Sequence, residues 1–147
     1  MKKNIKGIKI YKKKIISDSR GKIMHMLKST DAHFDYFGEI YFSQVNPKQI
    51  KAWHIHKKMT LNYVAVYGSI KLVLYDDRKN SETNGMIQEI VLSEKNHKLV
   101  KIPPMIWNGF KSNNKEKAIL ANCSSIPHDK REILRLPHND KKFPYTW

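Results

Sequence analysis

Apolar residues along this chain recur with a period of two or in short unbroken runs, and almost nowhere with the 3.6-residue period of a helix. Turn signals such as Asn46-Pro47, Gly68-Ser69 and Asn84-Gly85 separate these runs. Short runs bounded by turns are typical of a β-sandwich or barrel. The pattern therefore predicts an all-β protein with little helix.

Seven strands are expected from these runs. In Ser69–Tyr75, Ile70, Leu72 and Leu74 share one face, as expected when that face meets the core. Pro127 to Leu136 is predicted to form one or two helical turns instead. The predicted strands are Lys6–Ile16, Glu39–Val45, Asn62–Tyr67, Ser69–Tyr75, Met86–Leu92, Leu99–Ile102 and Ala118–Cys123.

The length of 147 residues suits one domain, residues 1–147, without a linker or an internal repeat. A chain of this size buries enough surface to fold without a disulfide or metal staple. The single cysteine, Cys123, has no partner for an internal disulfide, and the lysine-rich N-terminal segment lacks the apolar run of a signal peptide. No run approaches the length of a membrane-spanning helix. We expect a cytoplasmic protein that does not bind membranes.

The formal net charge of +15 raises nucleic acid as a partner. Only four of the 28 basic residues are arginine, however, whereas proteins that read bases and phosphates favour the arginine fork. Lysine, isoleucine and asparagine are abundant together, as in proteins from AT-rich genomes. The positive charge is therefore attributed mainly to the amino-acid bias of such a genome. Attraction of an anionic small molecule remains an alternative, and no nucleic-acid partner is expected.

Two histidines lie two residues apart in the segment Trp53-His54-Ile55-His56. On an extended strand such residues project to the same side, so the two imidazoles converge on one site. Metal-binding cupins add a glutamate and a third histidine, but the corresponding positions here hold Leu61 and Asn108. Two nitrogens alone make a poor site for a divalent cation, so no metal is expected. A metal-dependent cupin and a purely structural role for the histidines remain as alternatives.

Several short motifs, in order and from about Asp18 to Trp147, resemble the dTDP-4-dehydrorhamnose 3,5-epimerase family. The entry motif is Asp18-Ser19-Arg20-Gly21, and Lys51-Ala52-Trp53-His54 is similar to the family's R-G-L-H. The other matching segments are Gln44-Val45-Asn46, the glycine-led hairpin 68–78, Ser81 to Gly85, Ile102-Pro103 with Gly109-Phe110, and Asn139-Asp140 through Trp147.

The resemblance implies a cupin-type double-stranded β-helix (jelly roll) that epimerises or isomerises a nucleotide-linked 4-keto-6-deoxy sugar, in the synthesis of surface polysaccharide. The expected nucleotide is dTDP. The ketone acidifies the neighbouring C–H bonds, so proton transfer needs no cofactor. The resemblance also implies a homodimer, with Lys6–Ile16 as an exchangeable edge.

The same resemblance assigns roles to individual residues. His54 is the expected base, oriented by Asp140, and His56 is a further catalytic or substrate-contacting residue. Arg20 and Lys51 are expected at the diphosphate. Gln44 and Asn46 match the family's Q-x-N strand and are expected substrate contacts. Tyr41, Asn108 and Trp107 are further expected substrate contacts that do not rest on a family motif, and Trp107 could stack on a sugar or base.

Three positions depart from the family pattern. Leu61 and Ala121 fall where the family has a catalytic lysine and tyrosine, and His25 falls where a carboxylate helps to hold thymine. These departures motivate a second hypothesis, a non-catalytic cupin that binds a sugar nucleotide. A third comes from the run 54–58, which is similar to the H-A-H-K-K of the dTDP-sugar 3,4-ketoisomerases. There His54 and His56 would form the acid/base pair, with Tyr41 as a nearby donor.

Overall fold

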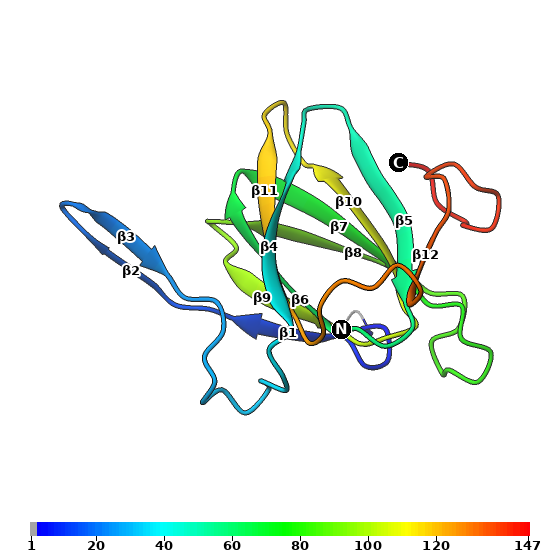
Figure 1. The fold of residues 1–147 in the computed structure, drawn as a ribbon. Coiled ribbons are helices and arrows are strands. Elements are labelled where there is room, and N and C mark those ends of the chain that lie inside the picture. Colours follow the sequence, from blue (N-terminus) through cyan, green and yellow to red (C-terminus); the bar gives the residue numbers. More distant parts are fainter. Residues whose placement is uncertain (1–2) are drawn as a thin grey trace.

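The computed structural model describes residues 3–147, which form twelve strands in two five-stranded antiparallel sheets and one projecting hairpin (Figure 1). This part of the chain contains no α-helix, and no helix that could cross a membrane. The first sheet has the order β1 (Lys9–Lys12), β9 (Lys98–Ile102), β6 (Leu61–Tyr67), β11 (Ala118–Ser124) and β4 (Glu39–Val45). The second has the order β12 (Ile133–Arg135), β5 (Ile50–His56), β10 (Trp107–Ser112), β7 (Ser69–Tyr75) and β8 (Ile87–Ser93).

The main core lies between the two sheets, and strand alternation decides which residues enter it. Ile70, Leu72 and Leu74 of β7 are each 0 % exposed, which confirms the predicted inward face of that strand. Tyr63 of β6 and Leu120 of β11 enter the same core from the first sheet. The two inner faces are thus joined by apolar burial, the main favourable term in folding.

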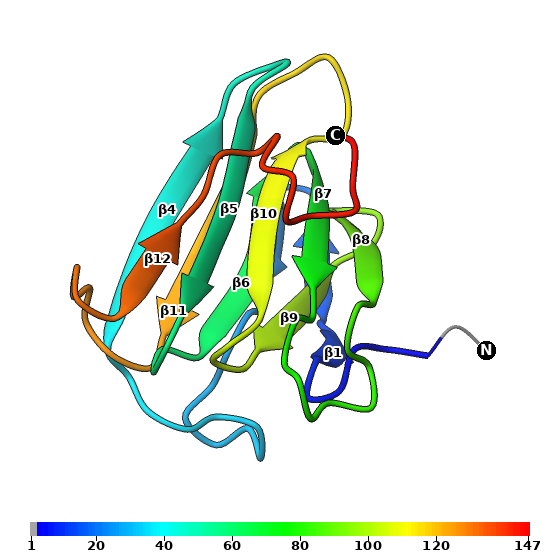
Figure 2. The ribbon, with the colours of Figure 1, turned by 90° about the vertical axis from the view of Figure 1, so that its right-hand side faces the viewer.

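A second apolar cluster covers the outer face of the second sheet. The segment that follows β12 returns across β5, β10 and β7 (Figure 2). It places Phe143 in a stack on Trp53, with ring centroids 4.4 Å apart, and Trp107 packs edge-on against Phe143. Both faces of this sheet are therefore buried, which makes it a firm wall for anything that lies on its inner side.

Two predicted elements are wrong. Lys6–Ile16 is not one strand: β1 pairs with β9, and after Lys13 the chain leaves the sheet to form a hairpin of β2 (Ile15–Asp18) and β3 (Gly21–Met24). The stretch from Pro127 to Leu136 is not helical, because Ile133–Arg135 forms β12 along the edge of β5. In both cases pairing with a distant strand, which one sequence does not reveal, overrides the local pattern.

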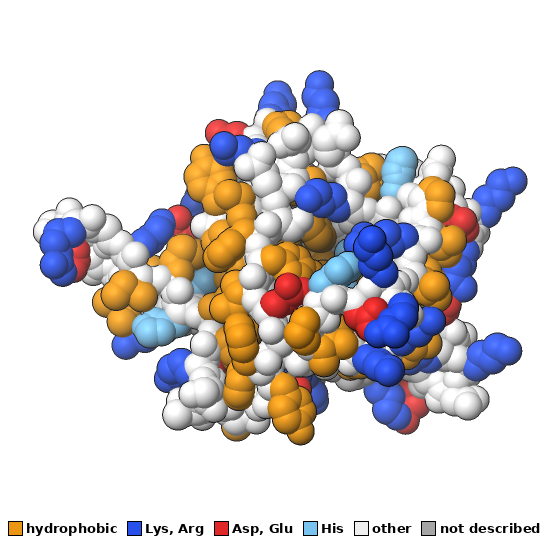
Figure 3. Space-filling model, in the orientation of Figure 1, with side chains coloured by type: hydrophobic (Ala, Val, Ile, Leu, Met, Phe, Trp, Pro, Cys, Tyr) orange, Lys and Arg blue, Asp and Glu red, His pale blue; other side chains and the backbone are white. Residues whose placement is uncertain are grey.

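Two elements present strand edges that no described strand covers. The hairpin of β2 and β3 projects away from the body (Figure 1), and within residues 3–147 β4 has only β11 as a neighbour in its sheet. On the outer face of β4, Ile40 is 54 % exposed and Phe42 is 66 % exposed. Figure 3 shows hydrophobic side chains gathered over this strand.

Candidate active site

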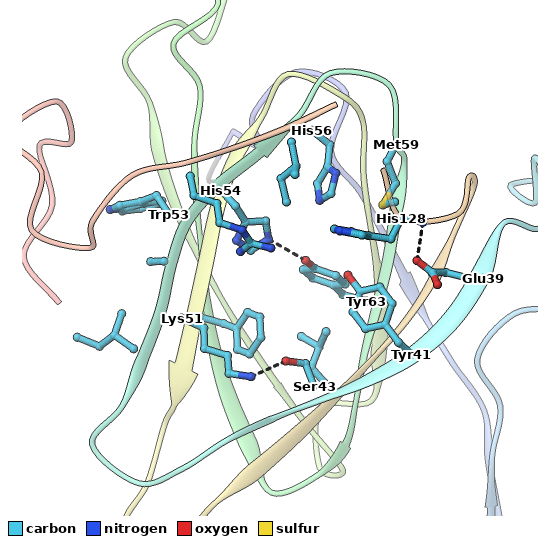
Figure 4. Close-up of a pocket in the computed structure, with 16 residues that line it drawn as sticks. Glu39, Tyr41, Ser43, Lys51, Trp53, His54, His56, Met59, Tyr63 and His128 are labelled. Atoms are coloured by element: carbon cyan, nitrogen blue, oxygen red, sulfur yellow. Dashed lines mark hydrogen bonds between the residues drawn. The ribbon is translucent and has the colours of Figure 1, made fainter. Parts of the chain in front are cut away.

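A cavity of about 630 Å³ opens between the two sheets, where β4 and β6 face β5 and β12. This volume is in the range of small-molecule sites. Its lining mixes apolar side chains with convergent polar ones, the composition expected of a specific binding site. The lining residues are Glu39, Tyr41, Ser43, Ile50, Lys51, Ala52, Trp53, His54, His56, Met59, Tyr63, Phe110, Leu120, His128, Ile133 and Arg135 (Figure 4 labels ten of them).

Strand β5 supplies three polar residues to this cavity. His54 and His56 project to the same side, as their spacing predicts. Lys51 would face the opposite side on a regular strand, but a bulge sets two residues of β5 against the single residue Gly109 of β10. The bulge brings Lys51 to the cavity, where its ammonium donates a 2.9 Å hydrogen bond to Ser43 Oγ.

His54 belongs to a buried chain of hydrogen bonds. Its Nε2 lies 3.3 Å from the Tyr63 hydroxyl, and that hydroxyl donates to Asn108 Oδ1 at 3.2 Å. The Asn108 amide in turn donates to the backbone oxygen of His54 at 3.4 Å. Burial lowers the pKa of His54 to about 3, with further lowering from His56 and Arg135. His54 is therefore a neutral imidazole at pH 7.

His56 is paired with a buried carboxylate. Its Nδ1 is hydrogen-bonded to Glu132 Oε1, and Glu132 is only 4 % exposed. The other carboxylate oxygen accepts the backbone N–H groups of Lys58, at 3.1 Å, and Met59, at 3.2 Å. Burial raises the pKa of Glu132, but the hydrogen bonds from His56 and from the two backbone donors outweigh it and hold the pKa below its usual range. Glu132 is therefore ionised and fixed in position.

The opposite wall of the cavity carries Tyr41, on β4. Asn122 of β11 donates a 3.0 Å hydrogen bond to the Tyr41 hydroxyl oxygen and uses its own amide oxygen to accept the backbone N–H of Asn62. Burial raises the pKa of Tyr41, and the Asn122 hydrogen bond offsets part of that effect. The phenol is thus a neutral hydroxyl whose proton is free to be donated into the cavity.

Two cations, Lys51 and Arg135, line the cavity on β5 and β12. Neither has a salt bridge to a carboxylate among residues 3–147. Permanent cations of this kind suit a phosphate or diphosphate. In the same part of the chain no three His, Cys, Asp or Glu side chains are grouped as metal ligands.

The family model for dTDP-4-dehydrorhamnose 3,5-epimerase matches residues 2–147. The chain belongs to this family. A protein of Haloferax volcanii named as a probable low-salt glycan biosynthesis epimerase is 29 % identical over 148 residues, which cover 98 % of this chain and 95 % of that protein. The spore coat polysaccharide biosynthesis protein SpsL of Bacillus subtilis is 26 % identical over 145 residues, covering 97 % and 96 %.

Solved structures agree with this membership. A dTDP sugar isomerase from Desulfovibrio desulfuricans superposes with a TM-score of 0.95 at 37 % identity, covering 97 % of this chain and 92 % of that one. The dTDP-6-deoxy-D-glucose-3,5-epimerase of Legionella pneumophila, solved with dTDP-4-keto-L-rhamnose, has a TM-score of 0.86 at 20 % identity, covering 99 % and 80 %. The latter likeness shows the fold, and the predicted cupin-type all-β architecture is confirmed.

The structure brings together four of the expected site residues: Tyr41, Lys51, His54 and His56 all line the cavity. Asn108 lies directly behind them, bonded to Tyr63 and to the His54 backbone.

Other expected residues lie elsewhere. Asp140 does not contact His54; its carboxylate accepts the backbone N–H of Lys142 in the C-terminal segment. Trp107 points to the outer face of its sheet, since it alternates with the inward Asn108, and its indole donates to Asp77. Neither residue lines the cavity.

Three further expected contacts also lie outside the cavity of their own chain. Gln44 faces outward from β4, because Tyr41 and Ser43 take the inward positions, and it donates to Asn46 just beyond the strand. Arg20 lies in the turn of the projecting hairpin, where it pairs with Asp18 and its side chain is 88 % exposed.

Sequence reasoning missed the partner of His56. Glu132 lies in the stretch that was expected to be helical, so nothing in the sequence placed it beside β5. Arg135 was missed for the same reason. Tyr63 is brought to His54 by the register of β6, which places it inward beside Leu61 and Ala65 and which a single sequence does not reveal.

Proposed function

We propose that this chain epimerises a nucleotide-diphosphate 4-keto-6-deoxy sugar, with dTDP as the expected nucleotide, in the synthesis of a surface polysaccharide. One observation carries the proposal: imidazoles on β5 and a neutral phenol on β4 face one cavity from opposite walls. An epimerase needs this arrangement, because the proton must leave one face of the carbon and return to the other. Family membership supplies the expected substrate class.

The chemistry starts from the ketone at C4 of the sugar, which acidifies the C–H bonds at C3 and C5. A histidine of β5 takes one proton, and the electrons of that C–H bond pass into the enolate. The oxygen of the enolate is best stabilised by hydrogen-bond donors or cations that are already in place when its charge develops, because they need no reorganisation. Tyr41 then donates its proton to the opposite face of the carbon and regains one from solvent. This sequence consumes no cofactor.

The diphosphate is assigned to the two cations of the cavity. Lys51 and Arg135 have no carboxylate partner among the described residues. Their positive charges are therefore available to an anion. Replacement of either by alanine should raise KM for the nucleotide sugar and leave the chemical step less affected.

Proton NMR in D2O tests the function. The protein is incubated with dTDP-4-keto-6-deoxyglucose, and separately with its GDP and CDP counterparts. An epimerase removes the C3 signal, the C5 signal or both, and the pattern identifies the inverted carbon. Unchanged spectra, despite binding shown by thermal stabilisation, would replace the proposal with a non-catalytic sugar-nucleotide-binding protein.

A 3,4-ketoisomerase is the second candidate, favoured by the fact that His54 and His56 both line one cavity. In that reaction the keto group moves to C3 by successive proton transfers. The same NMR experiment separates the two reactions, because only a ketoisomerase yields a 3-keto product.

We further propose that the protein acts as a homodimer, in the cytoplasm. Support comes from the exposed side chains of Ile40 and Phe42 on a strand with an unpaired edge, and from the projecting hairpin. A role for Arg20 at the diphosphate would require such a dimer, since its hairpin points away from its own chain's cavity. The buried free thiol of Cys123 fits a protein that does not depend on disulfides.

Light scattering after size-exclusion chromatography tests the dimer. Phe42→Asp should give a monomer, because a charge would be buried at the interface. Val91→Asp is the control, since Val91 is also exposed but lies on β8, in the other sheet. A monomeric parent protein, or a dimeric Phe42→Asp variant, would contradict the proposed interface.

A further inference from the structure

His56 is hydrogen-bonded to a carboxylate, that of Glu132, whereas the side chain of His54 contacts the hydroxyl of Tyr63. Glu132 is a buried carboxylate: one of its oxygens is hydrogen-bonded to His56, and the other accepts hydrogen bonds from two backbone N–H groups. It is also anchored by its backbone, since its carbonyl accepts the N–H of Lys57 and the next residue, Ile133, pairs with His56 across the strands. The carboxylate therefore has no freedom to turn away from the imidazole.

This pairing fixes the tautomer of His56. An ionised carboxylate can only accept hydrogen bonds, so Nδ1 of His56 carries the proton that it donates to Glu132. The lone pair then lies on Nε2. Figure 4 shows the His56 ring pointing into the cavity that it lines. A histidine held through one nitrogen by a carboxylate, with the other nitrogen bare, is the arrangement of a general base.

The hydrogen bonds of His54 favour the opposite tautomer, with the proton on Nε2. The single proton of the Tyr63 hydroxyl is donated to Asn108, so the contact between Tyr63 and His54 requires that His54 Nε2 donate to the phenol oxygen. That nitrogen is therefore occupied. Arg135 and the nearby imidazole of His56 also oppose a second proton on His54, and no carboxylate among residues 3–147 is hydrogen-bonded to its ring.

We propose that Nε2 of His56, oriented by Glu132, is the general base that removes the proton next to the ketone. His54 serves as a neutral residue that positions the substrate and the Tyr63–Asn108 pair. The C–H electrons pass into the enolate, the proton resides on the His56 imidazolium, and exchange with solvent regenerates the free base. Glu132 is a positioning residue, because it acts only through His56. The inference rests on the proposed function, and it moves the base from His54 to His56.

Solvent-deuterium exchange into dTDP-4-keto-6-deoxyglucose, followed by NMR, tests the assignment. His56→Ala should lower the exchange rate by about 10³-fold, the usual worth of a general base, with KM changed by much less. Added imidazole should restore part of the rate to His56→Ala, because the cavity left by the side chain admits a free base. His54→Ala is the matched variant on the same strand and should lose much less of kcat.

The effect of Glu132→Gln separates positioning from folding. This variant should lower kcat with little change in KM, because a neutral amide no longer fixes the tautomer of His56. Melting temperatures and dTDP binding report whether each variant is folded. Rescue of His56→Ala by imidazole does not depend on the behaviour of Glu132→Gln.

The outcomes are distinguishable. A parent protein that exchanges deuterium, together with a His56→Ala variant that exchanges as fast, would overturn the inference and leave the proposed function intact. Equal large losses in His54→Ala and His56→Ala, without imidazole rescue of the latter, would overturn it in favour of a shared acid/base pair. A folded parent protein that exchanges no deuterium into the dTDP, GDP or CDP sugars would overturn the proposed function and the inference with it.

Discussion

Two neighbouring histidines on one strand lie in opposite surroundings in this cavity. His54 is buried beside other cationic or potentially cationic groups, whereas His56 is hydrogen-bonded to a fixed carboxylate. Their shared spacing predicts only that both face the same side. The carboxylate of Glu132 makes His56 the paired one; Glu132 comes 76 residues after His56 and lies just before β12, which pairs with β5.

His54 makes folding stability depend on pH. Its pKa is about 3 in the folded protein and about 6.5 in an unfolded chain, so the unfolded state binds more protons between these values. The stabilisation is complete above pH 6.5 and is lost as the pH falls toward 3. Lowering the pH from 7 to 5 should therefore reduce the free energy of unfolding by on the order of 2 kcal/mol through this group alone.

Urea unfolding of the parent and of His54→Gln at both pH values measures this contribution. The variant should show a flatter pH dependence than the parent. His128→Gln is the control, because it makes the same substitution at an exposed histidine that also lines the cavity. Parallel curves for the parent and His54→Gln would show that His54 does not lose its proton on folding.

Tyr41 carries a separate prediction, because it lies on the wall opposite to His56. Tyr41→Phe removes the proton donor but leaves the base in place. The variant should therefore still exchange deuterium into the substrate, while inversion of configuration falls by about 10²-fold or more. Analysis of recovered sugar for both deuterium and configuration checks this result; inversion at the parent rate would remove Tyr41 from the mechanism.

At the level of elements, the bulge in β5 decides what the cavity contains. Regular alternation would turn Lys51 away from His54, and the extra residue turns it back. Gly109 makes the bulge possible, since a Cβ there would lie 2.3 Å from Ala52 Cβ. A single sequence gives no signal for such a register shift, so the position of Lys51 had to come from the resemblance.

Gly109→Ala should disturb both folding and binding. The added methyl group forces β5 away from β10, at a cost of about 1–3 kcal/mol in unfolding free energy, and should weaken nucleotide-sugar binding through Lys51. Adding Ala52→Gly removes the nearest clashing atom and should recover part of the loss. Chemical denaturation of the parent protein and the two variants checks this; an undiminished stability for Gly109→Ala would contradict the close approach of the two strands.

The loop between β7 and β8 is held by a buried carboxylate. Asp76 is 0 % exposed and accepts hydrogen bonds from the Arg78 guanidinium, Ser81 and Thr83. Burial raises the pKa of Asp76, but these donors outweigh it and hold the pKa well below its usual range. The family-like segments 68–78 and 81–85 thus meet at one structural anchor.

Asp76→Asn should lower the unfolding free energy by about 2–4 kcal/mol, because the amide cannot accept from all of these donors and leaves Arg78 without its charge partner. Glu82→Gln is the control, since Glu82 makes an exposed salt bridge to Lys6 that is worth little. Thermal denaturation compares the two variants. Equal small losses would show that Asp76 is not the anchor of the loop.

At the scale of the whole molecule, the sequence predicted the all-β class, the inward face of β7 and the convergence of the two histidines. These follow from side-chain periodicity, which is local. The projecting hairpin, β12 and the Glu132 partner depend on pairing between distant segments, and a single chain carries no local signal for them. For the same reason the sequence could not decide which expected site residues line the cavity: Tyr41 and Lys51 do, whereas Asp140 and Trp107 lie outside it.

Deuterium uptake by the nucleotide sugar tests the central claim most directly, namely that this cavity removes a proton next to a ketone. The parent protein is incubated with dTDP-4-keto-6-deoxyglucose in D2O, and the recovered sugar is analysed by mass spectrometry and NMR. The account predicts deuterium at C3, at C5 or at both, at a rate that His56→Ala lowers by about 10³-fold. A recovered sugar without deuterium, from folded protein that binds the nucleotide, would contradict it.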